Sequence, residues 1–363
     1  MLSFAPLGAV SATPQDTLDA ILADPGFGRY FSDHMAQATW TDGIGWHDGV
    51  VKAYTPFTME PGDAVLHYGQ EIFEGLKAYR HADGSIWLFR PEMNARRLQR
   101  SAARLDLPEL PEEDFLNSVY ALVEADRAWV PAADEMSYYI RPFMFAAESF
   151  LGVRSARNVT YAVVGGPAGA YFKGGVEPVD IWVTTTYSRA GDGGTGAAKC
   201  GGNYASSLIA QREAYEHGCS QVLFTDAATH EWVEELGGMN LFLVTSDGRV
   251  MTPPTSGTIL AGITRDSVLA LAPDLGLTAE ERPVSVSEMF AGIAEGDITE
   301  AFACGTAAVV NPIRAFRHAI DDRDDDIVLA QAFGPVTAKL RKTIVDIQWG
   351  RAGDPYGWMR RVC

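Results

Sequence analysis

The feature that most constrains the fold of this chain is a glycine- and proline-rich stretch near its middle, residues 165–175 (GGPAGAYFKGG). Clusters of these residues interrupt helices and strands, and they therefore mark loops and linkers. The length of 363 residues also corresponds to about two domains. We therefore predict a small N-terminal domain over residues 1–168, a linker over 169–179 and a large domain over 180–363.

Hydrophobic periodicity predicts helices and strands in both parts, which indicates a mixed α/β (α+β) fold. Hairpins should turn at Asp83-Gly84 and at Asp247-Gly248, because two apolar runs flank each polar pair. One helix should begin at Pro91 and another should end at Gly218, since these residues suit the two ends of a helix. Further helices are expected over 114–130 and after Gly262, and strands over 137–146, 158–166, 179–187 and 221–226, with a strand, a tight turn and a second strand within 298–313.

Charge and cysteine content exclude several classes of function. The formal charge of −18 argues against a nucleic-acid partner, because binding a phosphate backbone needs a basic face. The four cysteines form no Cys-x-x-Cys pair, so neither a metal site nor a disulfide framework is expected. The chain has no Lys or Arg before Arg29, unlike a signal peptide, and no apolar stretch long enough to span a bilayer. We expect a cytoplasmic protein without a membrane partner.

Lys199 is the only charged residue in a run of small and apolar residues, 196–211 (GAAKCGGNYASSLIAQ). A lysine amine has an ordinary pKa of about 10.4, so at neutral pH it is protonated and a poor nucleophile. Desolvation lowers this pKa, and lysines then become able to form Schiff bases. The small neighbours leave room for a flat aldehyde-bearing ring, although a solvated loop lysine is the plainer interpretation of the spacing alone.

Two later residues could bind such a ring. Tyr204 could form a hydrogen bond with a phenolate oxygen beside an imine. Glu235, in the stretch EWVEELGGMNLF, could hold a proton on a pyridine nitrogen, which makes the ring an electron sink. We expect the adjacent Glu234 in a solvated turn.

A phosphate group on that ring would need a cradle of N–H donors. Gly262 precedes Ile263 and Thr264, which open a helix whose free N–H groups and dipole favour an anion. The turn at Gly305-Thr306 could add further donors, and Arg97 could supply a full positive charge.

In combination, four stretches resemble the branched-chain amino acid aminotransferases, which are pyridoxal-phosphate enzymes of fold type IV: FRPEMNARRL, KCGGNY, EELGGMNLF and LAGITRDS. The resemblance extends from about Phe27 to the C-terminus. It implies a smaller α/β domain followed by a larger domain in which helices surround a pseudo-barrel sheet. It also implies a homodimer, with an active site between the two domains that the other subunit completes.

The same resemblance assigns the cofactor contacts. Lys199 matches the catalytic Schiff-base lysine, Tyr204 the tyrosine at the ring hydroxyl oxygen, and Glu235 the partner of the ring nitrogen. Arg97 matches the phosphate-binding arginine. The rest of the phosphate cup corresponds to Gly262, Ile263, Thr264, Gly305 and Thr306.

A substrate pocket follows from the resemblance as well. Its apolar and aromatic wall corresponds to Phe27, Tyr68, Phe73, Tyr139, Val153 and Tyr171. Such a wall suits a branched aliphatic side chain, which has no hydrogen-bonding group. Arg141 matches the arginine that receives the distal carboxylate of glutamate or 2-oxoglutarate, and the substrate α-carboxylate is expected near Thr306 and Ala307, close to Tyr68.

The implied reaction is a ping-pong transamination in which L-leucine, L-isoleucine or L-valine gives its amino group to 2-oxoglutarate, with pyridoxal 5'-phosphate as cofactor. Two other activities of the same fold stay open, D-amino acid aminotransferase and aminodeoxychorismate lyase, although Arg141 and the long N-terminal region argue against both. A catalytically silent binder of B6 vitamers is a further alternative, which the joint presence of Lys199, Tyr204, Glu235 and Arg97 disfavours.

Two positions depart from the family pattern. Ala308 and Asn311 stand where some members carry a Cys-x-x-Cys redox pair, so a thiol switch of that kind is not expected. Gly238 stands where some members have threonine, which removes a possible hydroxyl contact without abolishing activity.

Overall fold

The computed structural model describes residues 1–170, 176–320 and 323–363, and the chain forms two compact units. Unit 1 comprises Met1–Lys173, Ala198–Gly201 and Asp346–Cys363, and unit 2 comprises Gly174–Ala197 and Gly202–Val345. The predicted linker over 169–179 lies partly outside the described residues, so the predicted domain boundaries stay predictions.

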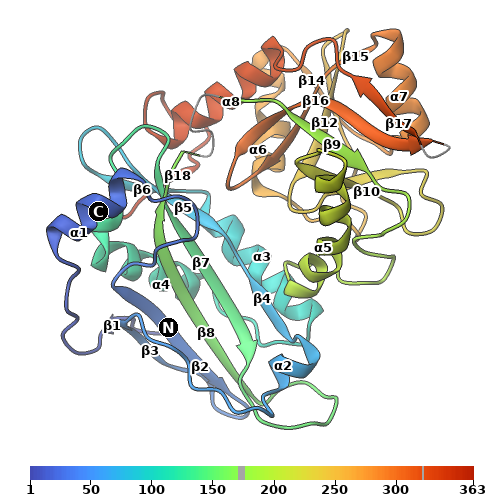
Figure 1. Cartoon of the computed structure of the whole chain (residues 1–363). Helices are drawn as coiled ribbons and strands as arrows, with labels where there is room; N and C mark the ends of the chain where they lie inside the picture. Colours follow the sequence, from blue (N-terminus) through green and yellow to red (C-terminus); the bar gives the residue numbers. More distant parts are fainter. Residues whose placement is uncertain (171–175, 321–322) are drawn as a thin grey trace. The chain divides into compact units, whose positions relative to one another are not determined.

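Unit 1 is built on a nine-stranded sheet (Figure 1). Its strands follow the order β1-β3-β2-β8-β7-β5-β6-β18, and β4 pairs with β7. All these pairs are antiparallel except β1 with β3. The strands are β1 (Ala5–Pro6), β2 (His34–Thr41), β3 (Gly45–Ala53), β4 (Glu71–Phe73), β5 (Leu76–Arg80), β6 (Ile86–Phe89), β7 (Ser137–Ala146), β8 (Asn158–Ala168) and β18 (Met359–Arg361).

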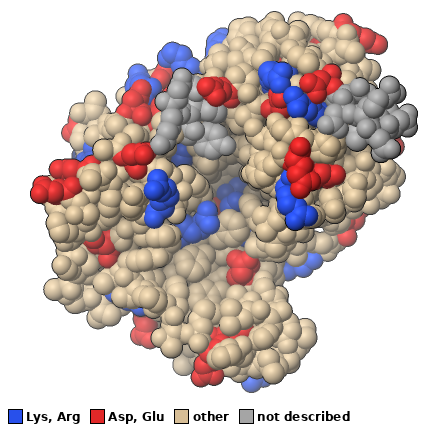
Figure 2. Space-filling model, in the orientation of Figure 1, with Lys and Arg blue, Asp and Glu red and all other residues tan. Residues whose placement is uncertain are grey.

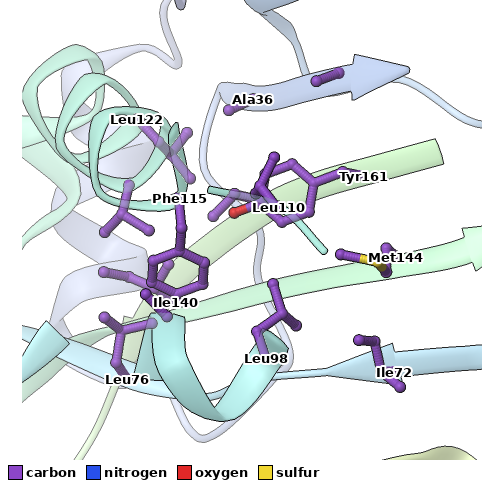
Figure 3. Packing of buried hydrophobic residues seen from close by; sticks show 14 of the residues in the cluster. Ala36, Ile72, Leu76, Leu98, Leu110, Phe115, Leu122, Ile140, Met144 and Tyr161 are labelled. Carbon is purple, nitrogen blue, oxygen red and sulfur yellow. The ribbon is translucent and has the colours of Figure 1, made fainter. Parts of the chain in front are cut away.

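Two helices, α3 (Pro91–Arg104) and α4 (Glu112–Ala125), cover this sheet, and α4 packs on β2, β3 and β8. Phe115 of α4 and Leu98 of α3 lie in one buried cluster with Leu76 and Ile140 of the sheet (Figure 3). Burying a side chain of this size contributes roughly 1.5–3 kcal/mol. Since Arg97 is the neighbour of Leu98, this core fixes the helix that carries Arg97. The shorter helices are α1 (Gln15–Ala23), α2 (Ala64–Tyr68) and the 3-10 helix η1 (Arg127–Trp129).

Unit 2 contains a second nine-stranded sheet, part of which closes on itself. Its strands follow the order β11-β10-β9-β16-β15-β12-β13-β14, and β17 pairs with β16. Because β11 also pairs with β12, the six strands from β11 to β12 form a barrel-like ring. The strands are β9 (Val179–Val183), β10 (Gln221–Thr225), β11 (Val233–Leu236), β12 (Asn240–Thr245), β13 (Arg249–Thr252), β14 (Thr278–Glu281), β15 (Ile298–Gly305), β16 (Val309–Ile320) and β17 (Arg323–Val328).

The helices that follow β9 in the chain are α5 (Gly201–Glu216), α6 (Ile263–Leu271), α7 (Val286–Glu295), α8 (Pro335–Gln348) and the 3-10 helix η2 (Pro273–Leu275). Helix α8 begins in unit 2, and its last residues belong to unit 1. Helices α6 and α7 both contact β15. Buried Leu241, Leu243 and Ile313 belong to the core of unit 2, so the ring is held by apolar contacts. The fold is the mixed α/β fold that the sequence predicts.

Several predicted elements are confirmed. Strands β5 and β6 pair across Gly84, and β12 and β13 pair across Gly248; both glycines have positive φ angles, of 83° and 85°. This left-handed region strongly favours glycine. The helix predicted to begin at Pro91 is α3, and Gly218 follows α5 with a φ of 70°. The strand predicted over 179–187 is shorter, since β9 ends at Val183.

Acidic and basic side chains are interspersed over the face seen in Figure 2. Within the described ranges, no helix is both long and apolar enough to cross a bilayer. The same residues contain no group of three or more His, Cys, Asp or Glu side chains arranged to hold a metal ion.

Candidate active site

Lys199 lies two residues before the start of helix α5, and two hydrogen bonds fix its backbone in unit 1. Its N–H donates to Ser101 Oγ on α3 at 2.9 Å, and its carbonyl accepts from Phe73 N–H on β4 at 2.9 Å. The Nζ atom lies 4.8 Å from the centroid of the Phe73 ring. The lysine is therefore held between a helix and a strand, and it is not the solvated loop lysine of the plainer interpretation.

The surroundings of Lys199 favour its neutral amine. Burial, followed by the guanidinium of Arg97, lowers the pKa of Lys199 from 10.5 to about 8, against the opposing charge of Glu74. A charged ammonium is disfavoured both by desolvation and by a nearby cation. Attack on an aldehyde requires the unprotonated amine, and near neutral pH that form is far more populated here than in an ordinary lysine.

Arg97 forms a buried ion pair with Glu74, a residue that the sequence reasoning missed. Arg97 Nε lies 2.7 Å from Glu74 Oε1, Arg97 Nη2 lies 2.8 Å from Glu74 Oε2, and Asn94 Nδ2 donates to the same Oε2 at 2.7 Å. Although burial raises the pKa of Glu74, the Arg97 charge and hydrogen bonds hold it below its ordinary value. This two-point contact fixes the plane of the guanidinium predicted to bind phosphate.

A cavity of about 620 Å³ lies in unit 1. Four of the predicted substrate-binding residues line it, namely Phe27, Phe73, Tyr139 and Arg141. Its wall is otherwise largely apolar, with Phe31, Met35, Tyr54, Pro56, Phe57, Phe143 and Val164 among the lining residues. This composition suits an aliphatic side chain, and Arg141 and Glu71 are the charged residues of the wall.

The other predicted pocket residues lie elsewhere. Tyr68 and Val153 do not belong to the wall of this cavity; Tyr68 Oη donates to Leu151 O at 2.5 Å, and Val153 is 88% exposed. Tyr171 lies outside the described residues.

Arg141 is surrounded by aromatic rings within the cavity. Its Cζ lies 4.7 Å from the Phe73 centroid and 5.4 Å from the Tyr139 centroid, and Nη2 donates to Tyr139 Oη at 3.1 Å. The ring of Phe27 meets that of Tyr139 edge-on, with centroids 4.9 Å apart. Cation–π contacts of this kind stabilise a guanidinium in apolar surroundings.

Glu235 is held by donors from three segments of unit 2. Arg189 Nη2 lies 2.5 Å from Glu235 Oε1, which also accepts from Leu260 N–H at 2.8 Å. Glu235 Oε2 accepts from Asn240 Nδ2 at 3.2 Å. Glu235 and Arg189 are only 3% and 6% exposed. This fixed, charge-paired carboxylate fits the partner of a protonated ring nitrogen, and Arg189 and Asn240 are functional candidates that the sequence did not indicate.

The expectation that Glu234 lies in a solvated turn is wrong. Glu234 is 6% exposed on strand β11, and its Oε1 accepts from Thr258 Oγ1 at 2.5 Å. Burial raises its pKa. The Gly-Gly pair after Glu235 does form a turn, but the two glutamates precede that turn on a strand of the closed ring.

Tyr204 and the turn at Gly305-Thr306 both approach the loop between β11 and β12. A Cβ atom at Gly238 would lie 3.8 Å from Tyr204 Cε1, and one at Gly305 would lie 3.2 Å from Met239 Cγ. The turn ends at Val309, whose φ of 62° is unusual for a β-branched residue. A residue keeps such a positive φ angle only where the surrounding structure holds it, and residues of this kind concentrate at functional sites.

Helix α6 begins beside the same strands. Gly262 is its N-cap, and a Cβ atom there would lie 2.0 Å from Asn240 Oδ1, so the chain approaches Asn240 as only glycine allows. Ile263 and Thr264 open the helix, and both are buried. The first N–H groups of a helix have no hydrogen-bond acceptor within the helix. Because Gly262 has no side chain to accept hydrogen bonds from them, this helix start suits an anion.

Comparisons with known proteins identify the family of this chain. Residues 71–316 match the amino-transferase class IV family. The chain is 51% identical to the branched-chain-amino-acid aminotransferase of Mycolicibacterium smegmatis over 97% of both sequences. It superposes on the branched-chain amino acid aminotransferase of Thermobaculum terrenum in its PLP form with a TM-score of 0.76 and 26% identity, over 91% of this chain and 98% of that one. The branched-chain aminotransferase of Thermoproteus uzoniensis with norvaline gives a TM-score of 0.73 and 28% identity, over 90% of this chain and 100% of that one.

Proposed function

Because the chain belongs to the class IV aminotransferases and, within them, to the branched-chain amino acid aminotransferases, we propose that it transfers the amino group of L-leucine, L-isoleucine or L-valine to 2-oxoglutarate. The products are the branched 2-oxo acid and L-glutamate. The main support for this function is the 51% identity to the branched-chain-amino-acid aminotransferase of Mycolicibacterium smegmatis over nearly the full length of both chains. The cofactor is pyridoxal 5'-phosphate, as in the related structure in its PLP form.

Lys199 is the residue that binds the cofactor aldehyde covalently. When bound, pyridoxal phosphate supplies a protonated ring that accepts the electron pair left on the substrate α-carbon. The released Lys199 amine would act as the acid–base group that takes up the proton from the substrate α-carbon and gives it back. A pKa of about 8 suits both directions of this transfer, because the group can take up and release a proton near neutral pH.

Glu235 keeps the ring nitrogen protonated, and Tyr204 donates to the ring hydroxyl oxygen. Arg189, Asn240 and the Leu260 N–H hold the Glu235 carboxylate in place. An anion fixed in this way stabilises a positive charge on the ring without having to reorganise during the reaction.

The phosphate is bound by the N-terminus of α6 at Gly262, Ile263 and Thr264 and by the turn at Gly305-Thr306. The helix start contributes N–H donors and the positive end of its dipole. Arg97, oriented by Glu74, contributes the full positive charge. A chain with a net charge of −18 needs such a local cation to hold a phosphate dianion.

The cavity in unit 1 is the side-chain pocket. Its apolar wall excludes water around a branched side chain, and Arg141 receives the distal carboxylate in the half-reaction with glutamate or 2-oxoglutarate. The α-carboxylate binds backbone N–H groups at Thr306 and Ala307. The pocket thus serves both substrates of a ping-pong cycle in turn.

We infer a cytoplasmic homodimer. Leu66, Leu151 and Val153 are 58%, 71% and 88% exposed, although they are apolar. The family pattern assigns Val153 to the substrate pocket, whereas it does not line the cavity of its own chain. Contribution of Val153 to the pocket of a second copy accounts for both observations. Light scattering that shows an active monomer contradicts this assembly.

A spectral titration of the purified holoenzyme tests the function. L-leucine should shift the absorbance of the bound cofactor, and 2-oxoglutarate should restore it, while D-alanine and aminodeoxychorismate should leave it unchanged. A response to either of the latter two instead of L-leucine favours the corresponding related activity. A spectrum that responds to none of the compounds indicates a silent binder.

A further inference from the structure

A pocket that accepts both leucine and glutamate has to hold an arginine without a ligand carboxylate for half of each cycle. Arg141 is that arginine, and no carboxylate among the described residues forms an ion pair with it. Its neighbours are the rings of Phe73 and Tyr139, and its Nε atom is buried without a hydrogen-bond partner among the described residues. Because Arg141 is only partly exposed and lies against aromatic rings, a nearby anion would stabilise its charge.

Glu71 is the anionic residue in the wall of the same cavity. It begins strand β4, two residues before Phe73, and its Oε1 accepts a hydrogen bond from the N–H of Gly201. The charge of Arg141 also acts on this carboxylate electrostatically and favours its ionised form. The carboxylate is therefore anchored in the wall of the cavity that Arg141 also lines. Glu71 and Phe73 alternate to the same face of β4, and Arg141 Cζ lies 4.7 Å from the centroid of that Phe73 ring.

We propose that Glu71 is the internal counter-charge of Arg141 and that it sets the balance between apolar and dicarboxylate substrates in this one pocket. The inference rests on the proposed function, which it extends to a specificity-determining residue. With a branched-chain substrate bound, Glu71 compensates the Arg141 charge within the same pocket. With glutamate bound, the same carboxylate repels the incoming distal carboxylate and weakens its binding.

The physical environment strengthens this effect. Burial raises the pKa of Glu71, while the Gly201 N–H and Arg141 oppose that rise. Charges act on one another more strongly across an apolar cavity than through water, so removing the Glu71 charge should be felt by a carboxylate bound at Arg141. The aliphatic side chain of a bound substrate carries no charge, so its affinity should not change when the Glu71 charge is removed.

The test compares wild-type holoenzyme with Glu71→Gln, which keeps an amide oxygen for the Gly201 N–H. Two dead-end acids without an amino group are the probes, glutarate and 4-methylpentanoate. The dissociation constants of the two acids are measured by calorimetry. Their inhibition constants are measured in assays with L-leucine as the substrate. The variant should bind glutarate roughly three- to ten-fold more tightly. Its affinity for 4-methylpentanoate should stay within about two-fold of wild type, or fall.

Two further variants act as controls. Glu71→Asp retains the charge and should keep the wild-type ratio of the two affinities. Glu124→Gln makes the same charge change at an exposed position of α4 and should alter neither affinity. If Glu71→Gln fails to fold, as judged by circular dichroism, Glu71→Ser serves as the second neutral variant.

An unchanged or weaker affinity for glutarate in the folded neutral variant overturns the inference, as does an equal gain for both acids. Failure of the proposed function gives a different result, because wild-type enzyme would then show no turnover of L-leucine. The calorimetric comparison of the two acids requires no turnover and measures the charge effect in either case.

Discussion

The guanidinium of Arg189 and the carboxylate of Glu235 lie 2.5 Å apart, and both side chains are almost completely buried. Arg189 also donates to the carbonyls of Gly196 and Thr258, at 2.9 and 2.5 Å. It therefore ties the segment before Lys199 and the segment before helix α6 to the carboxylate proposed to bind the ring nitrogen. Arg189 is a positioning residue for Glu235.

Arg189→Met should lower the free energy of unfolding by about 3–5 kcal/mol, because it leaves a buried carboxylate without its counter-charge. Chemical denaturation followed by circular dichroism measures this loss. Arg212→Met is the matched control, since Arg212 and its partner Glu216 are both exposed on α5 and such pairs contribute little. Equal losses in the two variants contradict a structural role of the buried pair.

Glu235→Gln should lower kcat with L-leucine by about 100-fold or more, because an amide cannot keep the ring nitrogen protonated. Rapid-mixing measurements on the variant loaded with cofactor separate this effect from loss of the cofactor. A variant that retains the cofactor and turns over L-leucine at the wild-type rate rules out the assignment of Glu235.

The reactivity of Lys199 should depend on pH with a midpoint near its pKa of about 8. Only the neutral amine reacts with an acylating reagent, so a lowered pKa moves the midpoint to lower pH. Arg97→Met should raise the midpoint, because it removes a nearby cation and leaves the anion Glu74 without its partner. Trace acetylation of cofactor-free protein, followed by peptide mass spectrometry, measures both midpoints, with the exposed Lys342 as internal reference. A wild-type midpoint of about 10 contradicts the proposed activation.

Gly262→Ala should weaken cofactor retention, because its Cβ atom would lie 2.0 Å from Asn240 Oδ1 and would displace a partner of Glu235. Overpacking of this kind costs about 1–3 kcal/mol. Thermal unfolding and cofactor retention after gel filtration are the two measurements. The control is Gly353→Ala, where an added Cβ meets no atom within 4 Å. Wild-type retention in Gly262→Ala shows that this close approach is unnecessary.

Local signals in the sequence predict the parts of the fold that depend on neighbouring residues. Gly84 and Gly248 mark hairpins because their positive φ angles are required by the turns themselves. Pro91 marks the start of α3 because proline suits the first turn of a helix. These features need no information about distant parts of the chain.

The residues that the sequence did not indicate act through contacts between distant segments. The Leu260 N–H donates a hydrogen bond to Glu235, 25 residues away in the sequence, and the Gly201 N–H donates one to Glu71, 130 residues away. The sequence favours a solvated turn at Glu234, yet the pairing of β11 in the closed ring buries its side chain. Periodicity over such a short strand does not reveal which partners cover it.

The most direct test of the account is to locate the cofactor on the chain. Borohydride reduction of the holoenzyme fixes the cofactor to the residue that carries it, and proteolysis with mass spectrometry identifies the modified peptide. We expect the phosphopyridoxyl group on Lys199, with no labelling of this peptide in Lys199→Ala. A label on another lysine, or an unlabelled Lys199 peptide from active enzyme, contradicts the central claim.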